Sequence, residues 1–165
     1  MAGTEEIPLQ RAKAKALRLL AARPRTAAGI RERLARDGFA EVADEVVGWL
    51  TGLGYLDDAA YARARARSLT APGRLGPRLA ERRLVAEGVP QDEAREAVGR
   101  ALCEAGAAPE AAEAALARAL VERRVRGPLA LLDDRDRARL ARFLLGRGFS
   151  GRAVSSALGV YVDSD

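Results

Sequence analysis

The chain has 165 residues, of which 48% are hydrophobic and only 4% are aromatic. Its formal net charge is +5, and it contains one cysteine and no histidine. This composition excludes an intramolecular disulfide and a cysteine-based metal cage, and it removes the commonest general base and zinc ligand. No apolar run reaches the roughly 18 residues of a membrane span, and residues 1–9 lack a signal-peptide core, so we expect a cytoplasmic protein.

Apolar residues recur at helical spacing along the whole chain, and no segment alternates as a strand would. After a flexible tail at residues 1–9, the first three helices are expected at 11–22, 26–37 and 40–53. The next three are expected from 57 or 58 to 69, from 77 to 87, and at 91–104. The last three are expected at 109–126, from 133 or 134 to 147, and at 151–158.

The second helix of each group ends in the same local pattern: a leucine, three further residues, a glycine and an apolar residue. The expected helix stops are Gly38, Gly88 and Gly148. Glycine adopts the left-handed conformation that ends a helix, and in the Schellman motif the next residue packs back on the last turn. The expected pairs are Leu34 with Phe39, Leu84 with Val89, Leu144 with Phe149 and, at a further stop at Gly54, Leu50 with Tyr55.

These patterns predict an all-α fold of three tandem three-helix repeats. The repeats are expected at residues 10–55, 56–105 and 106–160, followed by a C-terminal tail at 161–165. Three short, alanine-rich helices bury little area, so the repeats are expected to stack and share stability in an elongated curved array. A single compact bundle of eight or nine helices is the alternative.

No pattern indicates a catalytic centre. The chain has no Gly-rich phosphate loop, no Gly-x-Ser-x-Gly and no dinucleotide fingerprint. The pairs Asp57-Asp58 and Asp133-Asp134 begin expected helices, where carboxylates cap free N–H groups, so we interpret them as caps rather than magnesium ligands. We interpret Cys103 as a buried apolar residue. We therefore expect no enzyme activity, no metal and no cofactor.

Positive charge is concentrated between residues 63 and 83, where seven arginines accompany one acid, Glu81. Arginines four residues apart share a helix face, and guanidinium groups bind phosphate and carboxylate in a bidentate manner. The window therefore predicts a basic patch for DNA phosphates or an acidic protein surface. Its residues are Arg63, Arg67, Arg74, Arg78, Arg82 and Arg83. A solvated helix face in an arginine-rich proteome is the alternative.

The middle of the chain resembles the central signature of the RecX family. The resemblance lies in the run from Gly54 to Ala62 (GYLDDAAYA), then Arg67-Ser68, Gly76-Pro77, Ala80, Leu84 and Gly88-Val89. The flanks resemble the first and third repeats of the family at Arg25-Thr26, Ile30, Leu34, Gly38-Phe39 and Arg147-Gly148-Phe149-Ser150. The sequence departs from the family pattern at Ala80, where a larger aliphatic is usual, at Glu87, where a base is common, and at Gly29, where an acid is frequent.

The resemblance implies three tandem three-helix repeats and a regulatory role. RecX proteins bind the RecA recombinase filament on single-stranded DNA and inhibit its ATPase, strand exchange and coprotease activities. We expect a monomer that meets acidic subunit surfaces or DNA phosphates, with the DNA bound directly or through the filament. Two other hypotheses remain: a helix-turn-helix regulator of duplex DNA that acts without RecA, and a helical adaptor with no nucleic-acid role.

Overall fold

The computed structural model describes residues 3–104, 107–125 and 127–159, which form helices and no strand. The first six α-helices are α1 (Gly3–Ala22), α2 (Ala27–Arg36), α3 (Ala43–Gly52), α4 (Asp58–Thr70), α5 (Pro77–Ala86) and α6 (Gln91–Cys103). The remaining three are α7 (Pro109–Arg124), α8 (Asp134–Gly146) and α9 (Gly151–Leu158). Two short 3₁₀ helices, η1 (Ala40–Val42) and η2 (Leu129–Leu131), precede α3 and α8. No helix of these described segments has the length and apolar character needed to span a bilayer.

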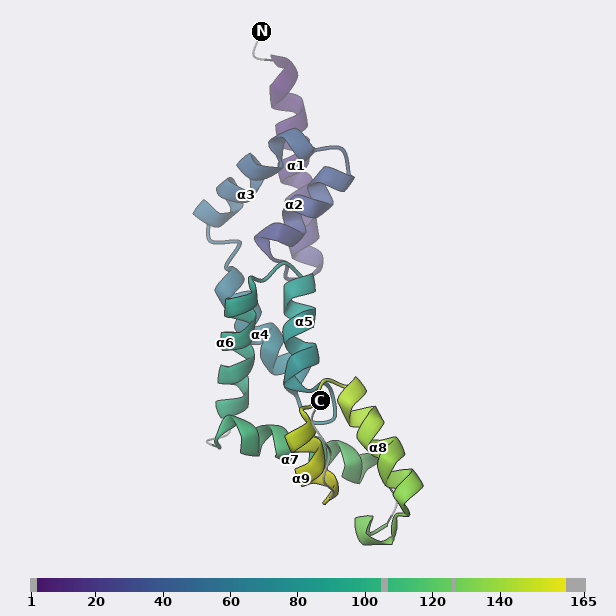
Figure 1. Ribbon diagram of the computed structural model, residues 1–165. Coiled ribbons are helices and arrows are strands. Elements are labelled where there is room, and N and C mark those ends of the chain that lie inside the picture. Colours follow the sequence, from purple (N-terminus) through teal and green to yellow (C-terminus); the bar gives the residue numbers. More distant parts are fainter. Residues whose placement is uncertain (1–2, 105–106, 126, 160–165) are drawn as a thin grey trace.

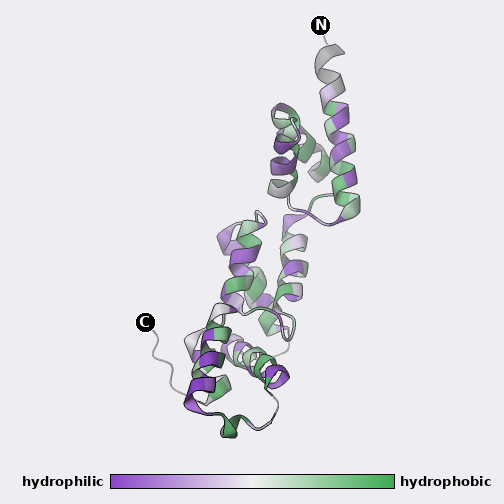
Figure 2. Cartoon of the chain, turned by 90° about the vertical axis from the view of Figure 1, so that its right-hand side faces the viewer, coloured by the Kyte–Doolittle hydropathy of each residue, from purple (hydrophilic) through white to green (hydrophobic). Residues whose placement is uncertain are grey.

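The helices form three groups of three that follow one another in an elongated, curved array (Figure 1). Each group has its own hydrophobic core, and Figure 2 shows hydrophobic residues in all three groups instead of one central cluster. The fully buried large side chains of the cores are Ile30, Leu34, Val46 and Leu50 in the first, Leu84, Val89 and Val98 in the second, and Leu144, Val121 and Val154 in the third. The predicted all-α repeat array is confirmed.

Helix α7 joins the second and third cores. Ala112, near its beginning, packs in the second core, whereas Leu120 and Val121, near its end, pack in the third. Leu116 lies between them and contacts both. The last two repeats therefore share a helix that contributes to both hydrophobic cores.

The four predicted glycine stops have the expected geometry. Their φ angles are +85° at Gly38, +74° at Gly54, +92° at Gly88 and +89° at Gly148. In each case the N–H of the next residue donates to the carbonyl of the predicted leucine. These donor–acceptor distances are 2.9 Å for Phe39 to Leu34, 2.9 Å for Tyr55 to Leu50, 3.0 Å for Val89 to Leu84 and 3.2 Å for Phe149 to Leu144. This bond from C″ to C3 defines the Schellman motif, so the prediction is confirmed.

The predicted caps are present, and one acid serves a neighbouring repeat. Asp57 accepts from the Ala60 N–H at 2.8 Å and caps its own helix, as Asp133 does for the Asp136 N–H at 2.7 Å. Asp58 instead accepts from the N–H of Ala27, the first residue of α2, at 2.8 Å. The two carboxylates of this pair therefore cap two different helices.

The structure differs from the sequence predictions at the beginning of α1 and at the end of α6. The backbone is helical from Gly3, where the sequence predicts a flexible tail to residue 9, because polar residues such as Glu and Gln also favour a helix. Cys103 is exposed, so its interpretation as a buried residue is wrong: α6 buries Val98 and Leu102, and the next position turns away from that face. Residue 126, the predicted end of the seventh helix, and the C-terminal tail at 161–165 lie outside the described residues.

A hydrogen bond of the same kind links the first repeat to the second and the second repeat to the third. Helices α2, α5 and α8 follow one another along the array, and the end of each later helix meets the start of the preceding one (Figure 1). At the first joint the Thr26 hydroxyl donates to the carbonyl of Glu87, the residue before Gly88, at 2.6 Å. At the second, the Gly76 N–H donates to the carbonyl of Arg147, the residue before Gly148, at 2.9 Å.

Close packing at the joints requires the two glycines. A Cβ on Gly88 would lie 2.6 Å from the Cβ of Ala28, and a Cβ on Gly148 would lie 2.4 Å from the backbone nitrogen of Leu79. A Cβ on Gly38 would meet nothing within 4 Å among the described residues, since no described repeat packs against this end of α2. The helix stops thus end helices in all three repeats and form contacts between repeats in two.

Candidate arginine-rich binding surfaces

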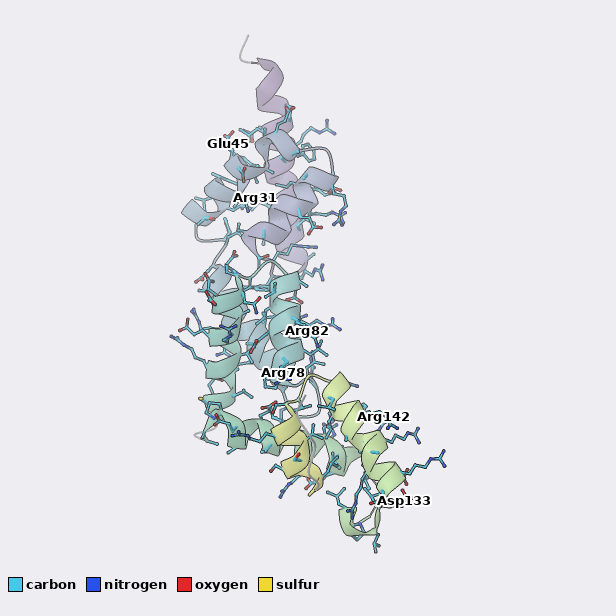
Figure 3. The ribbon with its side chains drawn as sticks, viewed as in Figure 1. Arg31, Glu45, Arg78, Arg82, Asp133 and Arg142 are labelled. Carbon is cyan, nitrogen blue, oxygen red and sulfur yellow. The ribbon has the colours of Figure 1, made fainter. Side chains whose placement is uncertain are left out.

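The six arginines of the predicted patch are all exposed, but the pair on α4 (Arg63 and Arg67) and the pair on α5 (Arg78 and Arg82) lie on different sides of the middle repeat. Arg63 lines a shallow groove on α4 and α6 with Arg100 and Glu104, and Arg67 forms an ion pair with Glu104 at 3.0 Å. Arg78 and Arg82 extend from α5 on the side away from α6 (Figure 3). The structure therefore does not bring the arginines of α4 and α5 together in one patch.

The division follows from the faces that the two helices bury. In α4 the buried residues include Ala62 and Ala66, and the arginine one position after each of them turns toward α6. In α5 the buried residues are Ala80 and Leu84, and the arginines two positions earlier turn to the opposite side. Equal spacing along the sequence therefore gives stripes on different sides of a three-helix repeat.

A second group of arginines gathers where the second and third repeats meet. The Arg147 guanidinium donates to the carbonyl of Arg74 at 3.4 Å, and that of Arg123 donates to the carbonyl of Pro72 at 3.5 Å. Arg147 and Arg124 also lie over the ring of Phe143, at 5.2 and 4.4 Å from its centroid. Arg142 extends from α8 on the same side as Arg78 and Arg82 in Figure 3. This side of the array therefore presents arginines from two repeats.

A groove between the first and second repeats was not predicted from the sequence. It has a volume of about 790 Å³. Five arginines line it, from the loop before α2, from α2 and from α4: Arg23, Arg25, Arg33, Arg36 and Arg65. Its two acids are Glu32 and Glu87. The available signal was the segment from residue 23 to 36, which holds five arginines and one acid, but its α4 wall lies far away in the sequence.

Glu87 is held at the groove by three donors. The Arg65 guanidinium binds it in a bidentate manner at 2.6 and 2.9 Å, and the Tyr61 hydroxyl donates to it at 2.8 Å. Burial opposes the charged form, but these hydrogen bonds outweigh it and hold the pKa of Glu87 below its usual value. Burial and the neighbouring Glu87 carboxylate raise the pKa of Tyr61, and the hydrogen bond to Glu87 raises the pKa of Arg65. The carboxylate at position 87, where the family pattern favours a base, is thus fully engaged.

Arg25 lies in the groove without such compensation. Its Nε atom is buried and has no hydrogen-bond partner among the described residues. Burial lowers the pKa of Arg25, and the positive charges of Arg23 and Arg33 lower it further. Three guanidinium groups are therefore crowded at one end of the groove.

Of the three arginines in this cluster, only Arg33 is paired with an acid among the described residues. Glu32 pairs with Arg36 at 2.5 Å, and Asp37 pairs with Lys15 at 3.0 Å and with Arg33 at 3.1 Å. The hydrogen bond from Lys15, with that from Arg33, lowers the pKa of Asp37. Within residues 3–104, 107–125 and 127–159, no group of three potential metal ligands comes together. The groove is therefore suited to bind anions through guanidinium groups.

Comparison with known proteins identifies the family. A model described as RecX, first three-helix domain, matches residues 12–50, and one described as RecX, third three-helix domain, matches residues 111–158. The chain is 44% identical over 140 residues to the regulatory protein RecX of Thermus thermophilus, covering 84% of this chain and 83% of that protein. It is 37% identical over 143 residues to the regulatory protein RecX of Mycobacterium ulcerans, covering 86% and 79% of the two chains.

A solved structure has the same fold. The crystal structure of RecX from Lactobacillus salivarius matches with a TM-score of 0.75 at 17% identity, covering 93% of this chain and 96% of that one. The repeat architecture, the glycine stops and the matches to both terminal domains thus agree. On the strength of its relatives and of the two family models, the chain belongs to the RecX family.

Proposed function

We propose that this protein binds the RecA recombinase filament on single-stranded DNA and inhibits its ATPase, strand exchange and coprotease activities. It would thereby act in the cytoplasm as a negative modulator of homologous recombination and the SOS response, as a monomer and without an enzyme activity of its own. The observation that carries the proposal is membership of the RecX family, whose relatives are named regulatory proteins. The sequence signature between Gly54 and Val89 supports the same role.

The shape of the array supports a mechanism of inhibition. An elongated, curved chain of repeats can contact several subunits of a helical filament at once (Figure 1). A ligand that binds one conformation of those subunits more tightly than the other shifts them toward it. Bound along the filament groove, the protein would oppose the cooperative closing that ATP turnover and strand exchange require.

The exposed arginines of α5 are the first candidates for contact with the filament. Arg78 and Arg82 lie one turn apart and form no ion pair within the described residues. They extend from the side of the array that also carries Arg142 (Figure 3). An acidic subunit surface or DNA phosphates could bind this stripe without breaking a contact that stabilises the fold.

A DNA-dependent ATPase assay of the cognate recombinase tests this assignment. Replacing both residues (Arg78→Glu with Arg82→Glu) is expected to raise the concentration for half-maximal inhibition by at least about tenfold, since attraction becomes repulsion. The charge-matched control replaces two exposed arginines of α1 and α9 (Arg11→Glu with Arg152→Glu) and should change it by less than about threefold. Equal effects of the two double variants in folded proteins would show that the α5 stripe is not the contact.

The corresponding pair on α4 tests the other side of the repeat. Arg63→Glu with Arg67→Glu changes the charge equally but alters the side toward α6. If only this variant impaired inhibition, the filament would contact α4 and not α5.

A gel shift with duplex DNA and no recombinase separates the regulator of duplex DNA from this proposal, because only the former requires sequence preference in that assay.

A further inference from the structure

We propose that the groove between the first and second repeats binds the phosphate backbone of a nucleic-acid strand. The observation that motivates this is the cluster of Arg23, Arg25 and Arg33 at one end of the groove. Burial lowers the pKa of Arg25, and the positive charges of Arg23 and Arg33 lower it further, because like charges repel. A protein tolerates such a cluster at low cost when an anion neutralises it.

Two of the three clustered arginines have no anionic partner among the described residues, whereas Arg33 pairs with Asp37 at 3.1 Å. The groove has two acids, and each is bound to an arginine: Glu32 to Arg36 and Glu87 to Arg65. Arg23 and Arg25 form no ion pair within the described residues, and the buried Nε atom of Arg25 has no acceptor there. A buried donor without an acceptor is rare in native proteins, and a bound ligand is one of its explanations.

The geometry favours phosphate over carboxylate. A carboxylate is planar and is satisfied by one bidentate guanidinium, as Glu87 is by Arg65 in this groove. A phosphate presents oxygens in more than one direction and can accept from several guanidinium groups at once. Three neighbouring arginines with one buried, unpaired donor therefore match a phosphate better than an acidic side chain.

The length of the groove favours a strand over a free phosphate ion. Its arginines are distributed from Arg25, before the start of α2, to Arg36, at the end of that helix. The helix has 10 residues and is about 15 Å long. A stacked strand rises by roughly 3.4 Å per nucleotide along its axis, so the groove spans about four nucleotides. This inference rests on the proposed function, because the strand available in a recombinase filament is single-stranded DNA.

Fluorescence anisotropy with a labelled oligothymidylate and no recombinase tests the groove directly. Replacing the two unpaired arginines (Arg23→Gln with Arg25→Gln) is expected to weaken binding by about tenfold. It should also make the slope of log affinity against log salt shallower by about 1.4, since each lost contact with a single strand removes about 0.7. The control Arg11→Gln with Arg152→Gln has the same charge change outside the groove and should retain most of the affinity. Thermal unfolding should be nearly unchanged, because neither groove residue pairs with an acid.

Three outcomes would overturn the inference. Equal losses in the groove variant and the control would show attraction by net charge alone. A labelled oligoglutamate that bound as tightly as the oligonucleotide, with the same loss in the groove variant, would indicate an acidic protein partner. Absence of oligonucleotide binding by the unmodified protein would exclude the site. If the oligonucleotide bound through the groove but the protein left the recombinase ATPase unaffected, the groove would stand and the proposed function would fail.

Discussion

A single residue, Glu87, contacts the first repeat through its backbone carbonyl and stabilises the second repeat through its side chain. Its backbone carbonyl accepts from Thr26 of the first repeat, and its side chain binds Arg65 and Tyr61 of the second. The side chains of Glu87 and Arg65 are 26% and 34% exposed, so solvent screens their attraction only in part. We expect Glu87→Gln to lower the free energy of unfolding by about 1–2 kcal/mol at pH 7, measured by urea denaturation.

The loss should depend on pH in a defined direction. Because the folded pKa of Glu87 is lowered, its contribution is fully present above the unfolded pKa of about 4.3 and is lost as pH falls through the folded value. The difference between native protein and variant should therefore be constant from pH 7 to 5 and shrink below about pH 4.3. Glu104→Gln is the matched control, since Glu104 and Arg67 are each 51% exposed, and it should cost less than about 0.5 kcal/mol. A difference that stayed undiminished at low pH would contradict the electrostatic explanation.

Gly38 only ends its helix, whereas Gly88 and Gly148 end their helices and also pack against the neighbouring repeat. Gly38→Ala should cost about 1–2 kcal/mol, because it places a Cβ at a φ of +85° in otherwise open space. Gly148→Ala adds a clash with the backbone nitrogen of Leu79 to the same backbone strain, and we expect about 1–3 kcal/mol more. Urea denaturation of the two variants measures the difference. Equal losses of unfolding free energy in the two variants would mean that the second joint accommodates the added methyl group without destabilising the protein.

The sequence predicts helix ends well when the interacting residues are close in the sequence, and it does not predict contacts between distant residues. The Schellman stops and the N-caps involve residues three to five positions apart, so their spacing identified them before the structure did. The joint between Thr26 and Glu87 spans 61 positions, and no local pattern indicates it. The groove was not predicted for the same reason: its arginines come from the loop before α2, from α2 and from α4, whereas the predicted patch came from one continuous stretch of sequence. Asp58 was identified as a cap, but the helix that it caps belongs to the preceding repeat.

The whole molecule is held together by contacts between neighbouring repeats. The first joint consists largely of hydrogen bonds from Thr26 and Ala27, whereas the second adds the sharing of α7 between two cores. In such arrays each repeat depends on its neighbours and the ends do not meet. The first joint has no helix shared between two cores, so bending there would be easier than at the second joint, as the proposed binding along a curved filament would require.

Small-angle scattering distinguishes this array from the single compact bundle that the sequence left open. A compact chain of this length has a radius of gyration of about 15 Å. Three repeats joined end to end place mass far from the centre, so we expect on the order of 20 Å or more, with a distance distribution that has a long tail. The value should not depend on concentration if the protein is a monomer. A radius near 15 Å with a symmetric distribution would mean that the repeats fold back on one another, and a groove between the first two repeats could then not remain open to a strand.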